Sequence, residues 1–349
     1  MLASAVFPSS WKYRRRVDRV VCASLPAPSR GGVAVKAIGM CEFGGPEVLQ
    51  LMDLPEPHAG AGEVRIRVHA AAVSPTDVLL RTGGHAVRMP GRRPPFVPGM
   101  DVAGVIDQVG PQLDGRLSVG QRVVAMPLFT GPRGGGYAEH VVVSAESVVA
   151  APAGVDFAAA STLLMNAMTA RIALDALESQ PGDSVAVTGA AGAVGGYAVE
   201  LAKADGLVVI ADASSVDTEL VRGFGADHVV QRGNDVAARI RELVPGGVPG
   251  LVDGSVQTTE ITPALADGGT LVELQGWSGP VERDITVRPI MVAPGGITDT
   301  VGLDRLARQA EDGVLSLRVA EVLPAAQAHR AHRMLEAGGV RGRLVLDFS

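Results

Sequence analysis

The fold of this chain depends on one segment, Val187-Thr188-Gly189-Ala190-Ala191-Gly192-Ala193-Val194-Gly195, named here the glycine loop. An apolar run, Ser184 to Thr188, leads into it, and an amphipathic pattern from Ala193 to Ala204 follows. Gly192 lets the backbone approach a pyrophosphate, Gly195 lets the helix pack tightly on the strand, and the helix N-terminus offers unpaired N–H groups to the anion. The glycine loop therefore predicts a strand, a turn and a helix that bind a dinucleotide.

The predicted cofactor contacts along this loop are Gly189, Ala191, Gly192, Ala193, Val194 and Gly195. A lone glycine triplet is also compatible with a plain tight turn. The surrounding rhythm favours the dinucleotide, because a second apolar run, Leu207 to Ile210, precedes a second helical pattern, Asp217 to Phe224. Repeated strand–helix units are typical of a parallel, doubly wound α/β sheet.

The end of the second strand bears on which nucleotide is bound. Asp212 lies 20 residues beyond Gly192, where an acidic residue can hold the ribose 2′-hydroxyl of NAD. Ser214, Ser215 and a nearby Arg can instead bind the 2′-phosphate of NADP. Asp212 can also be only a turn residue at the strand end. These residues alone leave NAD(H) and NADP(H) both open.

The chain before the doubly wound part has a different pattern. Short β-type runs between Gly and Pro turns fill residues 35–155, with period-two alternation from Glu63 to His69 and a further run from Gln121 to Met126. We expect an all-β, partly closed barrel there, followed by the nucleotide-binding domain at residues 156–290. The last segment, 291–349, is expected to hold two helices and a closing strand, at residues 303–311, 325–336 and 343–347.

The N-terminal extension, residues 1–34, is basic around Trp11-Lys12-Tyr13-Arg14-Arg15-Arg16, and Asp18 is its only acid. It is expected to be disordered and to lie outside the catalytic fold. Two interpretations stay open: an organelle transit peptide, or a start codon assigned too far upstream, with Val33 or Val35 as the true initiator. The protein is therefore expected in the cytoplasm, or in an organelle if the extension is a transit peptide.

Composition excludes several function classes. Hydrophobic residues make up 47% and charged residues 19% of the chain, which favours a compact soluble protein. A formal net charge of -6 gives no basic excess to bind nucleic acid. Gly, Pro or charged residues are expected to interrupt every run approaching the roughly 20 residues that span a bilayer. A small-molecule ligand is the remaining expectation.

The chain resembles the medium-chain dehydrogenase/reductase superfamily, in its quinone oxidoreductase or zeta-crystallin-like branch, over about residues 35–349. Besides the glycine loop, the motifs that carry the resemblance are Phe43-Gly44-Gly45-Pro46-Glu47-Val48-Leu49, Ser74-Pro75-Thr76-Asp77, Val97-Pro98-Gly99-Met100-Asp101-Val102-Ala103-Gly104-Val105, Gly136-Tyr137-Ala138-Glu139, Thr169-Ala170 and Gly225-Ala226-Asp227. The resemblance implies a GroES-like β domain on the substrate side, a Rossmann domain for the nucleotide, a C-terminal segment at residues 291–349 that returns to the GroES-like domain, and a homodimer.

The resemblance also bears on zinc. In zinc-dependent relatives the metal is held by Cys, His and Cys in the segments that match Ser74, Met100 and Met165. A hydroxyl and two thioethers are poor substitutes for those ligands, so no metal is expected. Among the seven histidines only His329 and His332 have a short spacing, and on a helix we expect both to be solvated. The reaction must then suit hydride transfer without a Lewis acid.

By resemblance, Ser74 and Thr169 are the candidate catalytic residues beside the nicotinamide, and Thr169 also binds the cofactor. Arg232 is placed to pair with a 2′-phosphate, which favours NADP(H); the alternative is a solvent-facing loop residue. Thr218 stands where a Lys is usual and weakens that preference. The expected substrate pocket is lined by Leu79, Met100, Met165 and Trp277, although Trp277 can equally pack on the Rossmann sheet.

The predicted reaction is hydride transfer from NADPH to a quinone or to an activated C=C bond, with the proton taken from water. Alternatives are an enoyl or acryloyl thioester reductase of lipid or natural-product metabolism, and a non-catalytic NADPH-binding protein. The thioester hypothesis is based on a run of arginines that could attract a phosphorylated acyl carrier, although a solvated loop explains these arginines as well. That run is Arg81, Arg88, Arg92 and Arg93.

Overall fold

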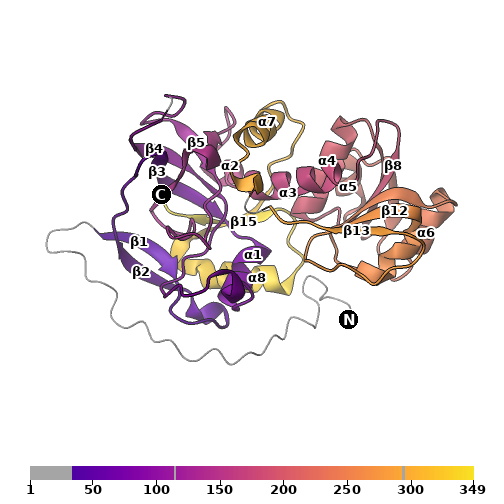
Figure 1. Cartoon of the computed structure of the whole chain (residues 1–349), viewed down its shortest axis with the longest axis horizontal. Coiled ribbons are helices and arrows are strands. Elements are labelled where there is room, and N and C mark those ends of the chain that lie inside the picture. The colour runs from indigo at the N-terminus through magenta and orange to yellow at the C-terminus, as the bar shows by residue number, and fades with distance from the viewer. Residues whose placement is uncertain (1–33, 114, 293–294) are drawn as a thin grey trace. The chain divides into compact units, whose positions relative to one another are not determined.

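Each of two compact units is built around one large sheet (Figure 1). The computed structural model describes residues 34–113, 115–292 and 295–349, so the expectations for residues 1–33 lie outside it. The first unit comprises the described residues up to Met165 with Ile297–Ala307 and Leu317–Ser349, and the second comprises the described residues of Asn166–Gly296 and Arg308–Ser316. The C-terminal part of the chain thus joins the first unit.

The first unit has a seven-stranded sheet in the order β14-β15-β3-β4-β5-β7, with β6 also paired to β3, and a separate antiparallel pair of β1 and β2. Its strands are β1 (Ala34–Gly39), β2 (Gln50–Pro55), β3 (Glu63–Ala72), β4 (Val102–Val109), β5 (Arg122–Ala125), β6 (His140–Ser144), β7 (Val148–Ala150), β14 (Val319–Pro324) and β15 (Arg343–Asp347). Its helices are α1 (Pro75–Arg81), α2 (Phe157–Ala160) and α8 (Ala328–Ala337). Short 3-10 turns lie at Pro46–Val48, Ala86–Arg88, Ala145–Ser147 and Ala325–Gln327.

The long strand β3 shows why this sheet forms. Val64, Ile66 and Val68 are buried in alternation, so the period-two pattern of the sequence places their side chains on the core face. Burial of each such side chain contributes about 1.5–3 kcal/mol. The closing strand β15 lies antiparallel to β3 and parallel to β14.

The second unit is a six-stranded parallel sheet in the order β10-β9-β8-β11-β12-β13. Its strands are β8 (Ser184–Thr188), β9 (Val208–Ala213), β10 (His228–Gln231), β11 (Val248–Asp253), β12 (Leu265–Glu273) and β13 (Thr286–Pro289). Its helices are α4 (Ala193–Ala204), α5 (Thr218–Gly223) and α6 (Val236–Leu243), with a 3-10 helix at Thr258–Ala264. A 3-10 turn at Gly295–Ile297 begins in this unit and ends in the first. The helices α3 (Leu164–Asp175) and α7 (Thr300–Glu311) each cross a boundary between the units.

The predicted fold class is confirmed: a β-rich unit precedes a doubly wound parallel sheet. The inner strands β8 and β11 are buried almost throughout, as strands of a sheet covered on both faces must be. The bounds expected for β8, α4 and β15 are those observed. The strand β9 extends to Ala213, so Asp212 lies within a strand and its interpretation as a turn residue is wrong.

One stretch of the described chain, residues 157–175, is long and apolar enough to cross a membrane by length and composition alone. It holds α2 and α3, and 67% of its apolar window is buried inside the protein, as in the core helix of a soluble protein. Arg171 is the only residue among Gly, Pro and charged types between Phe157 and Leu174, so this run comes closer to the length of a membrane span than the sequence analysis expected.

Candidate functional site

The glycine loop lies at the carboxyl end of β8, the strand whose two sheet neighbours are β9 and β11. Chain connections leave β8 toward opposite edges of the sheet, so this is the topological switch point of the doubly wound fold. Ligands of such sheets bind outside the carboxyl ends of the strands at this point. The position agrees with the dinucleotide site expected from the sequence.

The loop has no room for side chains at two of its glycines. A Cβ on Gly195 would lie 2.3 Å from the carbonyl oxygen of Gly189, and a Cβ on Gly189 would lie 2.7 Å from the carbonyl carbon of Gly254. Gly189 also has a φ of 68°, in the left-handed region. Gly192 is the N-cap of α4, whose first N–H groups therefore face the loop. The residues present fit a bound pyrophosphate.

Asp212 joins the glycine loop to Arg232, the residue that follows the neighbouring strand β10. Its carboxylate is 1% exposed and accepts a hydrogen bond from the Ala190 N–H at 3.3 Å. It also pairs with Arg232, whose Nε lies 2.8 Å from Oδ2 and whose second guanidinium nitrogen lies 3.2 Å from Oδ1. Both carboxylate oxygens are therefore already engaged by the protein.

Arg232 is the exposed partner of this pair. Burial lowers the pKa of its guanidinium, but the hydrogen bond and charge of Asp212 outweigh burial and raise the pKa overall. The side chain remains 38% exposed, so its other N–H groups can reach a ligand. Ser214 donates its hydroxyl hydrogen to Asp217 at 2.5 Å, and Ser215 is exposed. The structure thus brings Asp212 and Arg232 together and leaves Ser215 open to solvent.

Two further predicted residues lie in the second unit. Thr169 is half-buried on α3, and its place beside the nicotinamide stays a prediction. Trp277 follows β12 and packs, half-buried, against the core cluster of this unit. That contact agrees with the packing alternative for Trp277, and its role as a pocket wall stays a prediction.

In the first unit, Ser74 is the N-cap of α1 and only 1% exposed. Its Oγ is buried and has no hydrogen-bond partner among the described residues. Its backbone N–H donates to Asp77 Oδ2 at 2.9 Å. A substrate oxygen can reach the Ser74 hydroxyl only if a neighbouring group moves.

Asp77 is the centre of a buried polar network that the sequence analysis missed. Its carboxylate also accepts from the Gly99 N–H at 2.8 Å and from the Tyr137 hydroxyl at 3.1 Å. Burial raises the pKa of Asp77 to about 6, although these hydrogen bonds and the charge of Arg343 oppose the shift. Burial and the charge of Asp77 raise the pKa of Tyr137 well above its usual range. One carboxylate thus links Ser74 to the turn before Met100.

Met100 and Met165 are buried in the same unit. The Met165 N–H donates to Asp101 Oδ1 at 2.8 Å, and the other oxygen of Asp101 pairs with Arg343 at 3.1 Å. Arg343 on β15 also donates to the carbonyl of Val73. Within the residues that the structure describes, no three His, Cys, Asp or Glu side chains are grouped as a metal site requires.

Two histidines of the first unit are buried. His85 Nε2 lies 2.9 Å from the Thr76 hydroxyl, and burial lowers the pKa of His85 to about 4. His332 is fully buried, with Nε2 3.4 Å from the Tyr137 hydroxyl. Burial and the charge of Arg81 lower the pKa of His332 to about 3. The expectation that His332 is solvated is wrong, because α8 turns that face toward the protein interior.

These buried histidines predict acid-sensitive stability. A histidine whose pKa is depressed on folding stabilises the native state above its unfolded pKa of about 6.5, and the contribution is lost as the pH falls toward the folded value. At about 1.4 kcal/mol per pH unit, His332 contributes a few kcal/mol. Urea unfolding between pH 6.5 and pH 4 should therefore show a shallower loss of stability for His332→Gln than for the wild type. Equal slopes would refute this role, and His329→Gln on the same helix is the control.

Two of the arginines proposed to attract an acyl carrier donate hydrogen bonds to groups of the protein itself. Arg81 is fully buried and donates to the Gly44 carbonyl at 2.7 Å and to Glu336 at 2.5 Å. Arg92 donates to the carbonyls of Phe129 and Gly131. The idea of an arginine that attracts an acyl carrier is wrong for Arg81, which is fully buried, whereas Arg92 is half-buried and the idea stays a prediction for it.

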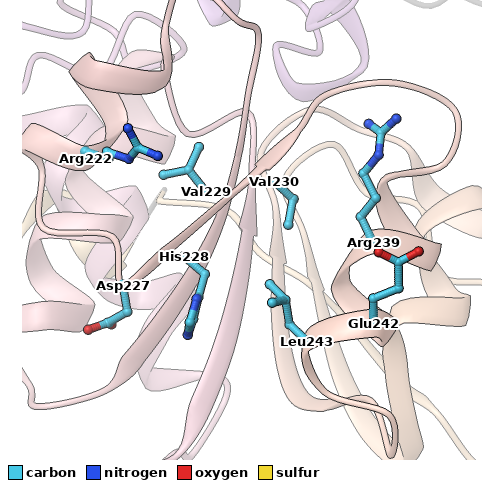
Figure 2. Close-up of a pocket in the computed structure, with 8 residues that line it drawn as sticks. All are labelled: Arg222, Asp227, His228, Val229, Val230, Arg239, Glu242 and Leu243. Atoms are coloured by element: carbon cyan, nitrogen blue, oxygen red, sulfur yellow. The ribbon is translucent and has the colours of Figure 1, made fainter.

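A surface hollow of about 370 Å³ lies at the outer edge of β10 (Figure 2). Arg222, Arg239 and Asp227 on its walls each pair with a neighbouring charge, on Glu219, Asp235 and Lys203. None of the predicted site residues lines it. The hollow is a charged, solvated surface distinct from the glycine loop.

The chain is similar to known oxidoreductases. Residues 60–153 match the alcohol dehydrogenase GroES-like domain, and residues 224–346 match the zinc-binding dehydrogenase family. A quinone oxidoreductase from Pseudomonas aeruginosa is 31% identical over 333 residues, covering 89% of this chain and 99% of the relative.

Solved structures of similar proteins also match most of the chain. A mycobacterial protein in complex with NADPH is 31% identical, covers 90% of this chain and 99% of its own, and has a TM-score of 0.77. The CurK enoyl reductase is 26% identical, with a TM-score of 0.79 and coverage of 90% of this chain and 99% of its own.

Proposed function

The chain belongs to the quinone oxidoreductase branch of the medium-chain dehydrogenase/reductase superfamily, and from this premise we propose that it reduces quinones or activated C=C bonds with NADPH and without zinc. Its relatives include a quinone oxidoreductase and a protein solved in complex with NADPH, which supports a nicotinamide cofactor. The observation that carries the proposal is the glycine loop at the switch point, where the backbone leaves no room for a Cβ at Gly195.

Bound NADPH supplies the hydride, and the residues of this chain supply placement. The glycine loop and the N-terminus of α4 would hold the pyrophosphate of the cofactor, and Thr169 would orient its nicotinamide. The apolar residues proposed to contact the acceptor are Leu79, Met100 and Met165 of the first unit and Trp277 of the second. Water is the proposed source of the proton, and the rate comes from orientation and exclusion of bulk solvent.

The preference for NADPH over NADH is supported by the pairing of Asp212 with Arg232. An acidic residue at this strand end can accept the ribose 2′-hydroxyl of NAD, but here both carboxylate oxygens are engaged by Arg232 and Ala190. The guanidinium held by Asp212 presents its remaining donors to a 2′-phosphate. The paired carboxylate therefore serves to orient the cation that recognises NADPH.

Arg232→Ala should weaken NADPH binding by roughly tenfold to a hundredfold, because charge-assisted hydrogen bonds contribute about 1.5–3 kcal/mol each. NADH affinity should be unchanged or improved, since the change frees Asp212 to accept a 2′-hydroxyl. Isothermal titration with both nucleotides measures the two constants. Arg222→Ala, which removes an exposed arginine of the same unit, is the control. Equal weakening of NADPH and NADH would contradict the role of Arg232.

Zinc independence is proposed from the donor set. The segments that hold zinc in zinc-dependent relatives carry Ser74, Met100 and Met165 in this chain. A neutral hydroxyl and two thioethers lack the thiolate and imidazole character that zinc prefers. Without a Lewis acid the acceptor must already be electron-poor, as quinones and enones are.

A second candidate activity, reduction of enoyl or acryloyl thioesters, is favoured by the similarity to an enoyl reductase along nearly the whole chain. The experiment that separates the two is steady-state NADPH oxidation with a panel of quinones, enones and enoyl-CoA thioesters. Turnover of quinones supports the main proposal, and turnover of thioesters alone supports the second. NADPH binding without turnover of any acceptor would favour a non-catalytic NADPH-binding protein.

The assembly and the location are proposed from the resemblance to the family. We propose a homodimer located in the cytoplasm, or in an organelle if residues 1–34 act as a transit peptide. Its partner is a small-molecule acceptor, with no role for nucleic acid or a membrane. Sedimentation velocity of the purified chain tests the homodimer directly.

A further inference from the structure

The chain turns sharply after β12, and one buried carboxylate organises the turn. Glu273, the last residue of β12, is fully buried. Its Oε2 accepts hydrogen bonds from three consecutive backbone N–H groups, at 2.8 Å from Gln275, 2.5 Å from Gly276 and 2.8 Å from Trp277. Gly276 has a φ of 95°, which favours glycine and lets the three groups converge. Such a ring of backbone N–H groups is an anion site, and the chain supplies the anion itself.

Glu273, which anchors this turn, is held between two neighbouring strands. Glu273 pairs with β11 opposite Asp253 and with β13 opposite Pro289, and its carbonyl accepts from the Ile290 N–H at 2.9 Å. In the described part of the chain its second carboxylate oxygen, Oε1, is buried without a hydrogen-bond partner. Every side-chain hydrogen bond that Glu273 makes there is therefore directed at the turn.

Trp277 is the residue that the turn positions. Its indole is half-buried and packs against the core cluster of the second unit, together with Val281 and Val287. The backbone N–H of Trp277 is one of the three groups held by Glu273. Without the carboxylate, this N–H and the two N–H groups before it would lose their hydrogen-bond acceptor together. The backbone at Trp277 would then no longer be held in place, and neither would the indole.

We infer that Glu273 is a positioning residue, whose buried carboxylate holds the turn at Gln275–Trp277 and thereby fixes the Trp277 indole for contact with the acceptor. The hold of Glu273 on the turn lies entirely within the second unit. The contact between the indole and the acceptor rests on the proposed function. The two parts are tested separately, by fluorescence and by kinetics.

Fluorescence tests the positioning. Trp11 and Trp277 are the two tryptophans of the chain, so Trp11→Phe leaves Trp277 as the only indole. In that background, Glu273→Ala should shift the Trp277 emission to longer wavelength and increase its quenching by acrylamide, because the indole becomes more accessible to water. Glu273→Gln keeps an acceptor oxygen for the three N–H groups and should retain the parent emission. Glu219→Ala, which removes an exposed glutamate of the same unit, is the control.

Kinetics tests the consequence for the acceptor. Glu273→Ala should raise the KM for the quinone by roughly tenfold, equivalent to about 1.4 kcal/mol of lost binding, with a smaller change in kcat. Glu273→Gln should recover most of the loss. If the protein proves inactive toward every acceptor, the proposed function fails, while the fluorescence result still stands as the test of positioning.

Glu273→Asp keeps the charge but is one methylene shorter, so it carries the test if the alanine variant does not fold. It should show the same emission shift, because its oxygens no longer reach all three N–H groups. Circular dichroism establishes that each variant is folded. Parent-like emission and quenching in folded Glu273→Ala or Glu273→Asp would overturn the inference.

Discussion

Gly195→Ala should weaken NADPH binding by at least about 100-fold, which corresponds to roughly 2.7 kcal/mol. The new Cβ would lie 2.3 Å from the Gly189 carbonyl oxygen and 2.8 Å from the Ala190 Cα, and both are backbone atoms. A backbone clash cannot be relieved by rotating a side chain, so the glycine loop must move away from α4. The N–H groups that face the pyrophosphate would then lose their arrangement.

Titration of the folded variant with NADPH, followed by nicotinamide fluorescence, measures this effect. The matched control is Gly223→Ala in α5 of the same unit, where a Cβ meets no atom within 4 Å. That variant should bind NADPH normally and gain slightly in stability, because alanine favours the helix. Wild-type affinity in Gly195→Ala would show that the cofactor does not use this loop.

Arg343→Met should destabilise the protein by about 3–5 kcal/mol, the second large effect expected. Arg343 and Asp101 are 4% and 1% exposed, and their ion pair joins β15 to the segment that also binds the Met165 N–H. Methionine keeps much of the side-chain volume but leaves the Asp101 carboxylate buried without its cation. An uncompensated buried charge is far more destabilising than the loss of an exposed pair.

Urea unfolding monitored by circular dichroism gives the free energies for this comparison. Arg222→Met removes an exposed ion pair and should change stability by less than about 1 kcal/mol. The double variant Asp101→Asn/Arg343→Met should recover part of the loss, because it removes both charges. If Arg343→Met is as stable as Arg222→Met, the buried pair does not hold the C-terminal strand.

Local sequence patterns predicted much of the fold. The glycine loop, the apolar runs around it and the alternation in β3 each depend on neighbours within a few residues, and the bounds of β8 and α4 were predicted correctly. The extension of β9 to Ala213 was missed, because Asp212 is a polar residue that normally ends a strand. Its partner Arg232 lies 20 residues further along the chain, after β10, so this pairing cannot be seen in the local pattern.

The candidate site was harder to predict for the same reason. Asp77 stood inside a recognised motif, but its partners Gly99 and Tyr137 lie far along the chain. His332 lies on an amphipathic helix, and sequence spacing alone did not show that it faces inward. Glu273 was overlooked because its three partners are backbone N–H groups, which leave no trace in residue type. The sequence signal that could have revealed it is an acidic residue at the end of an apolar run, just before a turn that contains glycine.

The most direct test of the central claim is NADPH oxidation by the chelator-treated protein with a quinone acceptor, followed by the absorbance of the reduced nicotinamide. We expect turnover to persist after chelation and to be faster with NADPH than with NADH at equal concentration. Loss of turnover on chelation with recovery on adding zinc, or absence of oxidation with every acceptor while NADPH still binds, would contradict zinc-independent reduction by this protein.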